Sequence, residues 1–501
     1  MLIDGRTLAR SSTLDADICI VGAGPAGLTL ASELADWPGT VVLVESGGAD
    51  ASADAQLLNA AAVDGDPYGG LERSRHRQVG GTARLWNTPL RRVSGAKFVP
   101  LDPVDFRGLN GRPAWPLQYA DLEPDYRRAH TVAGLGRFGY EGSAWDLPPP
   151  PVPPDHPVFA SRVFQFGPAA RFCADLPGEL ARAANITLCH SATAIGFRWR
   201  GSTVAAVDAV TASGVPLTIN ARRVVLAAGG VENARMLLVE AEAGNLRDES
   251  GWLGRGFMEH PRDYSLALAA TVPSQRLEFL DTHVVEGATV CGRLALREEA
   301  ILREDLPNAS VTVLPMGRPL RPFHWRLERL ARRRFGVSLS WPPGFGWSRL
   351  PRFARPFSGF QVLINFEEFP HPDNRLVLDS ATDALGVRRA RLQRRWQRAD
   401  AARHERLRSR VALGLAEIGL GPLSIGPLVP PDANSHHHMG TTRMGPDAKT
   451  GVTDVHGQVF GTDNLFVAGA SVFPAAGFAN PTLTSIALSL RLARWLKGGT
   501  A

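Results

Sequence analysis

The chain contains Ile-Cys-Ile-Val-Gly-Ala-Gly-Pro-Ala-Gly at residues 18–27, followed by the apolar run Val-Val-Leu-Val at residues 41–44. Continuous apolar runs of this length predict strands that are buried on both faces. The segment between the two runs predicts a helix over residues 28–35. Residues 17–48 therefore predict the opening strand–helix–strand unit of a doubly wound α/β fold.

Three glycines in this unit have the spacing of a dinucleotide-binding turn, namely Gly22, Gly24 and Gly27. The first allows the tight turn, the second the approach of a pyrophosphate, and the third close packing of the helix on the sheet. Glu45 ends the second strand, where a carboxylate can bind a ribose hydroxyl, and Ser46 follows it. The alternative is a glycine-rich turn without a ligand, and the motif does not separate NAD from FAD.

Length and composition indicate a globular protein of two or three domains, with 501 residues, of which 44% are hydrophobic and 21% charged. The net charge of +6 is weak support for nucleic-acid binding, and no nucleic-acid module is recognisable. The four cysteines show no metal-binding or CxxC spacing. A polar N-terminus and the lack of 18 successive apolar residues predict a soluble, cytoplasmic protein without a transmembrane segment.

The rest of the chain alternates between an α/β pattern and a pattern of antiparallel strands. We expect a helix over residues 120–134, a stiff proline-rich connector at 148–154 and a buried strand at 223–230 that ends in a glycine turn. Residues 262–428 contain alternating segments that predict an antiparallel sheet, with a helix at 401–418. Residues 458–501 return to a strand, a loop and a terminal helix.

A basic and aromatic segment, residues 318–357, interrupts the second pattern. Phe323, Leu327 and Leu330 form one apolar helical stripe among arginines. Such a stripe is compatible with contact to a membrane, a protein or an anionic ligand. A solvated helix that covers the substrate-binding part is the favoured alternative.

His437 and Asn480 are the candidate catalytic residues. Histidine suits proton transfer because its ordinary pKa lies near neutrality. Residues 435–438, Ser-His-His-His, are also compatible with an exposed polar loop, whereas no regular element directs three adjacent histidines to one metal ion. Asn480 precedes Pro481, so it is also a candidate helix cap.

A second glycine-rich loop, Gly-Gly-Thr-Ala-Arg-Leu-Trp-Asn at residues 80–87, is compatible with a surface turn or with a backbone that passes closely over a flat ring.

The chain resembles the glucose–methanol–choline (GMC) oxidoreductases over nearly its whole length. The resemblance is carried by residues 437–445, His-His-Met-Gly-Thr-Thr-Arg-Met-Gly, and by residues 480–484, Asn-Pro-Thr-Leu-Thr. Residues 228–235 and Phe-Met-Glu-His-Pro at 257–261 are most similar to the bacterial branch with pyranose oxidases and glycoside 3-oxidases.

This resemblance implies FAD as the cofactor, His437 as the catalytic base and Asn480 as its polar partner. It also implies that the cofactor contacts two glycine-rich turns and three later segments, through Gly22, Gly24, Gly27, Glu45, Ser46, Gly80, Gly81, Thr82, Asn87, Ala228, Gly469, Ala470, Pro481 and Thr482. Fungal pyranose oxidases attach FAD through a histidine in the loop that matches residues 80–87. Leu85 stands at that position here, so non-covalent FAD is expected, and no metal is expected.

The expected architecture is a discontinuous, Rossmann-like FAD-binding domain with an inserted α+β substrate-binding domain on an antiparallel sheet. The predicted boundaries are residues 1–105, 157–261 and 429–501 for the first domain, 106–156 for a connector and lid-like segment, and 262–428 for the second.

The expected reaction is oxidation of a secondary hydroxyl of a sugar or glycoside to a ketone, with electrons passing to O₂ or a quinone-type acceptor. Oxidation of a non-sugar alcohol, an FAD-containing lyase and a flavin-fold binding protein without redox chemistry are the alternatives.

Overall fold

The computed structural model describes residues 1–8, 12–90, 93–269, 271–317, 330, 334, 346–349, 355, 357–420, 422–433 and 435–498. Most of the basic segment 318–357, including Phe323 and Leu327 of its expected apolar stripe, lies outside these residues.

The first of three sheets contains the predicted strand–helix–strand unit. Its strand order is β1 (Leu2–Asp4), β8 (Ile186–His190), β3 (Val41–Val44), β2 (Ser12–Val21), β11 (Pro216–Leu226), β10 (Thr203–Thr211) and β9 (Ala192–Arg200), with β20 (Leu465–Val467) beside β11. The pairings from β1 to β11 and from β11 to β20 are parallel, whereas β9, β10 and β11 pair in antiparallel fashion. The carboxyl ends of β2, β3, β11 and β20 therefore lie at one edge of the sheet.

Helices pack beside this sheet and complete the larger core. They are α1 (Pro25–Glu33), α4 (Tyr119–Ala133), α5 (Leu176–Arg182), α6 (Gly229–Glu242) and α10 (Thr482–Leu496). α1 packs against α5 and α10, and α10 packs against α4. Leu28, Leu30 and Ala31 of α1 are all fully buried, as expected for a helix that is covered on several sides.

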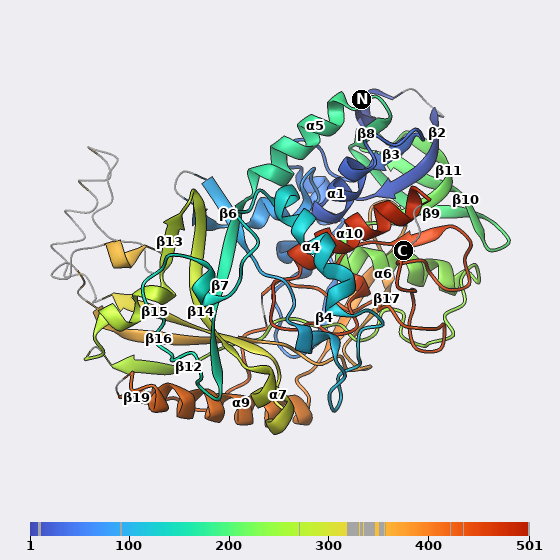
Figure 1. Ribbon diagram of the computed structural model, residues 1–501. Coiled ribbons are helices and arrows are strands. Elements are labelled where there is room, and N and C mark those ends of the chain that lie inside the picture. Colours follow the sequence, from blue (N-terminus) through green and yellow to red (C-terminus); the bar gives the residue numbers. More distant parts are fainter. Residues whose placement is uncertain are drawn as a thin grey trace.

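The second sheet is antiparallel and lies beside the first in Figure 1, with the long helix α9 (Arg398–Glu417) along its outer side. Its order is β19 (Leu423–Ile425), β12 (Arg262–Ala269), β16 (Phe357–Phe366), β15 (Ala309–Gly317), β14 (Ala288–Leu296), β7 (Phe159–Pro168), β6 (Val93–Phe98) and β5 (Thr88–Leu90), with β13 (Thr282–Val285) beside β14. Leu407, Val411 and Leu415 of α9 share a core with alternate residues of these strands, so one face of the sheet is apolar and packed.

A small third sheet comprises β17 (Arg375–Thr382), β18 (Arg388–Arg394) and β4 (Ala62–Gly65). The short helices are α2 (Ala53–Leu57), α3 (Leu71–Ser74) and α7 (Glu298–Glu304).

The mixed α/β character is as predicted, and the strand at residues 41–44 has the predicted bounds. Two local details differ. α1 begins at Pro25 rather than at residue 28, because Gly24 already has the extended conformation of an N-cap. β5, β6 and β7 pair within the antiparallel sheet, although their residues were expected in segments 1–105 and 157–261 of the dinucleotide-binding part. The division into domains stays a prediction.

Candidate active site

His437 and Asn480 meet in the structure although 43 residues separate them in the sequence, as the Nδ2 atom of Asn480 lies 3.1 Å from the Nε2 atom of His437. Asn480 does not cap α10: the residue before the helix is Pro481, and no side-chain oxygen caps the helix. The Oδ1 atom of Asn480 is buried and has no hydrogen-bond partner among the described residues. The two side chains thus form a polar pair with one amide oxygen left open.

The protonation of this pair is set by His260, whose Nδ1 atom lies 2.8 Å from the Nδ1 atom of His437. The Nε2 atom of His260 lies 2.8 Å from the carbonyl oxygen of Gly477, which accepts hydrogen bonds only, so Nε2 carries the proton. Burial lowers the pKa of His260 to about 4, so the ring is neutral and its Nδ1 atom is an acceptor. His437 must then donate from Nδ1.

The Nε2 atom of His437 consequently carries no proton, and its lone pair accepts the hydrogen bond from the Asn480 amide. Burial, with the nearby His260 adding to it, lowers the pKa of His437 well below its usual range, so the ring is neutral at physiological pH. A neutral histidine whose Nε2 atom carries no proton is the form that a general base requires.

The backbone of His437 is held by a buried carboxyl group. The Oε2 atom of Glu259 accepts a hydrogen bond from the His437 N–H at 2.9 Å, and Tyr68 donates its hydroxyl to the Oε1 atom. The Nε2 atom of His438 lies 2.9 Å from the same Tyr68 hydroxyl, so His438 is directed away from His437. Burial raises the pKa of Glu259 to about 7.

The glycine turn has the geometry that its spacing predicts. Gly22 has a φ of +107°, and a Cβ atom there would lie 2.7 Å from the Ala227 carbonyl oxygen. A Cβ atom on Gly27 would lie 2.0 Å from the carbonyl oxygen of Gly22, which leaves room for no side chain where α1 crosses β2. A Cβ atom on Gly24 would meet nothing within 4 Å, so the middle glycine borders open space at the start of α1.

Glu45 and Ser46 lie at the carboxyl end of the neighbouring strand β3. The Glu45 carboxylate accepts hydrogen bonds from the Ala23 and Gly47 N–H groups, both at 2.8 Å, so it also ties the glycine turn to β3. Burial raises the pKa of Glu45, although both hydrogen bonds oppose this shift. The Oγ atom of Ser46 lies 2.8 Å from the Thr193 hydroxyl and accepts a hydrogen bond from Arg77 at 3.1 Å.

The second glycine-rich loop lies against the first turn. Gly80 and Gly81 have φ values of +100° and +53°, and the Gly80 N–H donates to the Ala23 carbonyl oxygen at 2.9 Å. A Cβ atom on Gly81 would lie 2.9 Å from the Cα atom of Gly24. The side chains of Thr82 and Asn87, in and just after the 3₁₀ turn Gly81–Leu85, are exposed. The loop is therefore packed against the glycine turn and is not an independent surface turn.

The remaining predicted cofactor residues lie at the ends of two further parallel strands and at the start of α10. The Oδ1 atom of Asn233 accepts a hydrogen bond from the Ala228 N–H at 2.8 Å, and its Nδ2 atom donates to the Ala468 carbonyl oxygen at 3.1 Å. This side chain thus connects the ends of β11 and β20. Gly469 has a φ of +104°, and the Ala470 carbonyl oxygen accepts the Gly440 N–H at 3.2 Å. Pro481 and Thr482 begin α10.

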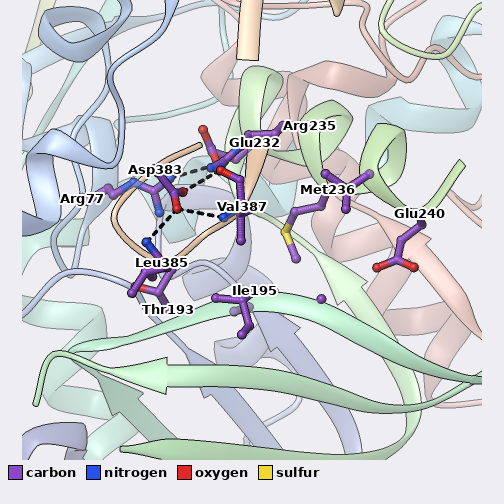
Figure 2. A pocket seen from close by; sticks show the side chains of 13 residues that line it. Arg77, Thr193, Ile195, Glu232, Arg235, Met236, Glu240, Asp383, Leu385 and Val387 are labelled. Atoms are coloured by element: carbon purple, nitrogen blue, oxygen red, sulfur yellow. Dashed lines mark hydrogen bonds and ion pairs between the residues drawn. The ribbon is translucent and has the colours of Figure 1, made fainter. Parts of the chain in front are cut away.

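A cavity adjoins Ser46 through its lining residues Arg77 and Thr193. Figure 2 shows Glu232, Arg235 and Asp383 meeting on one side of this cavity, with Ile195 on the opposite side. Although burial opposes the shift, the guanidinium groups of Arg77, Arg75 and Arg235 hold the pKa of Glu232 far below its usual range. The cavity therefore has a charged wall that is already internally paired.

Three residues of this site, His260, Glu259 and Tyr68, had no predicted role. Met258 pairs with Met439 in an isolated antiparallel bridge, and this register places His260 opposite His437. The motif at residues 257–261 was the available signal, but nothing in it indicates which distant segment it contacts.

Comparison with known proteins adds an independent result. Residues 370–489 match the family model described as GMC oxidoreductase. A 2-methyl-1,2-propanediol dehydrogenase of Mycolicibacterium austroafricanum is 27% identical over 445 residues, which cover 78% of this chain and 76% of that one. A C-glycoside 3-oxidase of Microbacterium trichothecenolyticum is 40% identical over 118 residues, 23% of this chain and 22% of that one.

Solved structures share the fold. The pyridoxine 4-oxidase described from Mesorbium loti superposes with a TM-score of 0.55 at 18% identity, covering 97% of this chain and all of that one. An FAD-dependent oxidoreductase from Chaetomium thermophilum superposes with a TM-score of 0.55 at 17% identity, covering 96% of this chain and 99% of that one. In the part of the chain that the structure describes, no helix is long and apolar enough to cross a membrane. The GMC oxidoreductase family model thus matches residues 370–489, and the chain as a whole has the fold of these solved structures.

Proposed function

We propose that the protein uses non-covalently bound FAD to oxidise a secondary hydroxyl of a sugar or glycoside to a ketone. The observation that carries this proposal is the position of His437, whose Nδ1 atom lies against His260 and whose Nε2 atom lies beside the Asn480 amide. A base with an adjacent polar partner is what removal of a hydroxyl proton requires.

The residues at the carboxyl edge of the parallel sheet fit a dinucleotide. The open space at Gly24 leaves room for a pyrophosphate at the start of α1, whose first N–H groups have no partner within the helix. Glu45 and Ser46 would hold the ribose. Gly80, Gly81, Thr82, Asn87, Ala228, Gly469, Ala470, Pro481 and Thr482 would hold the flavin part. FAD, when bound, supplies the two-electron acceptor for the substrate.

Leu85 supports non-covalent binding. It stands in the glycine-rich loop where the related fungal enzymes have a histidine, and 39% of its surface is exposed. A leucine side chain has no nucleophilic atom with which to form a flavin bond. We therefore expect denaturant to release all flavin into a protein-free filtrate.

In the proposed reaction the substrate hydroxyl replaces the Asn480 amide at Nε2 of His437, which takes the hydroxyl proton, while the Asn480 amide turns to orient the substrate oxygen. Proton transfer by a positioned base contributes about 10²- to 10⁴-fold to a rate. The Glu259 carboxyl holds the backbone N–H of His437, and His260 holds its Nδ1 atom, so the imidazole ring is kept in place.

The names of the relatives support the substrate class. About a quarter of the chain is similar to C-glycoside 3-oxidases and to a pyranose 2-oxidase of Tricholoma matsutake, the latter at 33% identity over 124 residues. The relative aligned over 78% of this chain is a diol dehydrogenase, which favours a small aliphatic alcohol as the second candidate. Electrons then pass to O₂ or to a quinone-type acceptor.

An anaerobic experiment tests the proposal. The flavin-loaded protein is mixed with neutral sugars, glycosides, their carboxylated counterparts and 1,2-diols, and the absorbance of oxidised flavin is followed. Loss of the band with sugars or glycosides is the expected result, and the rate of recovery in air then separates an oxidase from a dehydrogenase. Reduction by diols alone would replace the sugar assignment, and bound FAD that no alcohol reduces would contradict the redox function.

A further inference from the structure

Two cations lie over one aromatic ring on the inner side of the antiparallel sheet. The Nζ atom of Lys97 lies 5.0 Å from the centroid of the Phe164 ring, and the Cζ atom of Arg293 lies 5.7 Å from the same centroid. Lys97 belongs to β6, Phe164 to β7 and Arg293 to β14, so three neighbouring strands contribute to this cluster.

Strand register explains why these side chains share a face. Lys97 pairs with Phe166, and Cys291 pairs with Phe164. Directly paired residues, and residues two apart in one strand, point to the same side of a sheet. The opposite side carries Val163, Val290 and Leu294, which are buried in the core beneath α9.

The face of the sheet that carries the two cations lies on the side of His437 and Asn480. The Phe164 ring stacks on that of Phe478, with centroids 5.9 Å apart, and Phe478 lies two residues before Asn480. The charge of Lys97 is among the influences that lower the pKa of both His437 and His260.

No carboxylate neutralises the two cations. Neither Lys97 nor Arg293 forms an ion pair with any described residue. Arg293 is 4% exposed: its Nη1 atom donates to the carbonyl oxygens of Leu280 and Gly292 and to the Cys291 sulfur, whereas its Nε atom has no hydrogen-bond partner among the described residues. Arg262, the next cation on this face, is paired with Asp432 at 2.5 Å, and burial keeps the Cys291 thiol uncharged by raising its pKa.

Cations withdrawn from water without a neutralising carboxylate are costly, so they persist mainly where a ligand supplies the opposite charge. We propose that Lys97 and Arg293 form an anion subsite that binds a carboxylate group of the alcohol substrate. This inference rests on the proposed function and narrows its substrate class to carboxylated sugars or glycosides, such as uronic acids.

A monoanion fits the charge of the pair. Burial, together with the charges of Arg293 and Arg262, lowers the pKa of Lys97 to about 7. At neutral pH the pair therefore carries between one and two positive charges, which one carboxylate neutralises better than a dianion does. A bound carboxylate in turn favours the charged form of Lys97.

Equilibrium binding tests the subsite without turnover. Acetate and its neutral isostere acetamide are titrated into the flavin-loaded protein, and the flavin absorbance is recorded. We expect acetate to bind at least about tenfold more tightly than acetamide, since hydrogen bonds to charged groups are the stronger ones. The affinity for acetate should fall as pH rises through about 7, where Lys97 loses its proton. This measurement needs no variant.

Lysine variants then assign the effect. Lys97→Met retains the apolar stem over Phe164 and should lose the preference for acetate, whereas Lys97→Arg should keep it. Lys449→Met is the matched control, because Lys449 is exposed. Among substrates, a glucuronide should be oxidised with at least about tenfold higher kcat/KM than the corresponding glucoside, and Lys97→Met should remove this difference.

The outcomes separate the subsite from the function. Equal binding of acetate and acetamide, or undiminished acetate binding by Lys97→Met, overturns the subsite even if neutral glycosides reduce the flavin. If Lys97→Met changes the flavin reduction potential and lowers kcat/KM equally for charged and neutral substrates, the lysine acts on the flavin and not on a substrate carboxylate. This result also overturns the subsite. Tight acetate binding without reduction by any alcohol retains the subsite and contradicts the proposed function.

Discussion

The Asn480 amide donates to His437 Nε2 at 3.1 Å and leaves its own Oδ1 atom buried without a partner among the described residues. The sequence left helix capping and substrate positioning both open for Asn480. The structure has no side-chain cap on α10, so positioning the substrate oxygen is the role that this contact supports.

Asn480→Ala should therefore slow flavin reduction by about a hundredfold, the usual cost of losing one preorganised donor in an active site. Because no cap is lost, the free energy of unfolding should change by less than about 1 kcal/mol. Stopped-flow reduction and thermal unfolding measure the two effects. Asn220→Ala, at an exposed asparagine, is the control. Normal reduction combined with a large loss of stability would instead assign Asn480 a structural role.

The pH dependence of flavin reduction should follow the depressed pKa of His437. A histidine base is active when unprotonated, and burial lowers this pKa well below 6.5. With a neutral substrate, the rate should stay constant as pH falls through 6.5 and decline only in more acidic solution. A decline centred at or above 6.5 would contradict the assigned environment of the base.

Unfolding sets the lower limit of this pH experiment. His260 and His438 have pKa values lowered to about 4 and about 3, so below 6.5 they bind protons more readily in the unfolded chain. Their contribution makes the fold less stable as pH falls from 6.5 toward these values. Circular dichroism at each pH distinguishes unfolding from titration of His437.

His260 should act by fixing the tautomer of His437. His260→Leu removes the acceptor for the Nδ1 proton and should slow flavin reduction by about ten- to hundredfold, the cost of a buried donor without a partner. His260→Asn offers an amide oxygen near the position of Nδ1 and should restore most of the rate. His436→Asn, at the exposed neighbour of His437, should behave as wild type. Equal losses in the Leu and Asn variants would indicate a packing role instead.

Two glycines offer a matched pair that separates cofactor binding from folding. A Cβ atom at Gly24 meets nothing within 4 Å, whereas one at Gly27 would lie 2.0 Å from the Gly22 carbonyl oxygen. Gly24→Ala should fold with the stability of the wild-type apoprotein and bind FAD more weakly. Gly27→Ala should lose about 1–3 kcal/mol of stability or fail to fold. Thermal unfolding without FAD and flavin titration make the comparison. Unchanged FAD affinity in Gly24→Ala would contradict the assigned pyrophosphate position.

The glycine turn was predictable from the sequence because the strand, the turn and the helix that require these glycines follow one another directly in the chain. The pairing of His437 with Asn480 was expected only through resemblance to a family, since no spacing rule connects residues 43 positions apart. His260 had no assigned role because its contact depends on the Met258–Met439 bridge between distant segments. β5 and β6 were not predicted as strands, because strands this short carry too few alternating residues to show which sheet they join.

The most direct test of the central claim is the anaerobic rate of flavin reduction in His437→Ala, measured at saturating substrate beside the wild type, with the flavin content of both proteins determined first. If His437 is the base, the variant retains its FAD and is reduced at least about a hundredfold more slowly. Reduction at a rate near that of the wild type, with the same FAD content, would show that another group takes the hydroxyl proton.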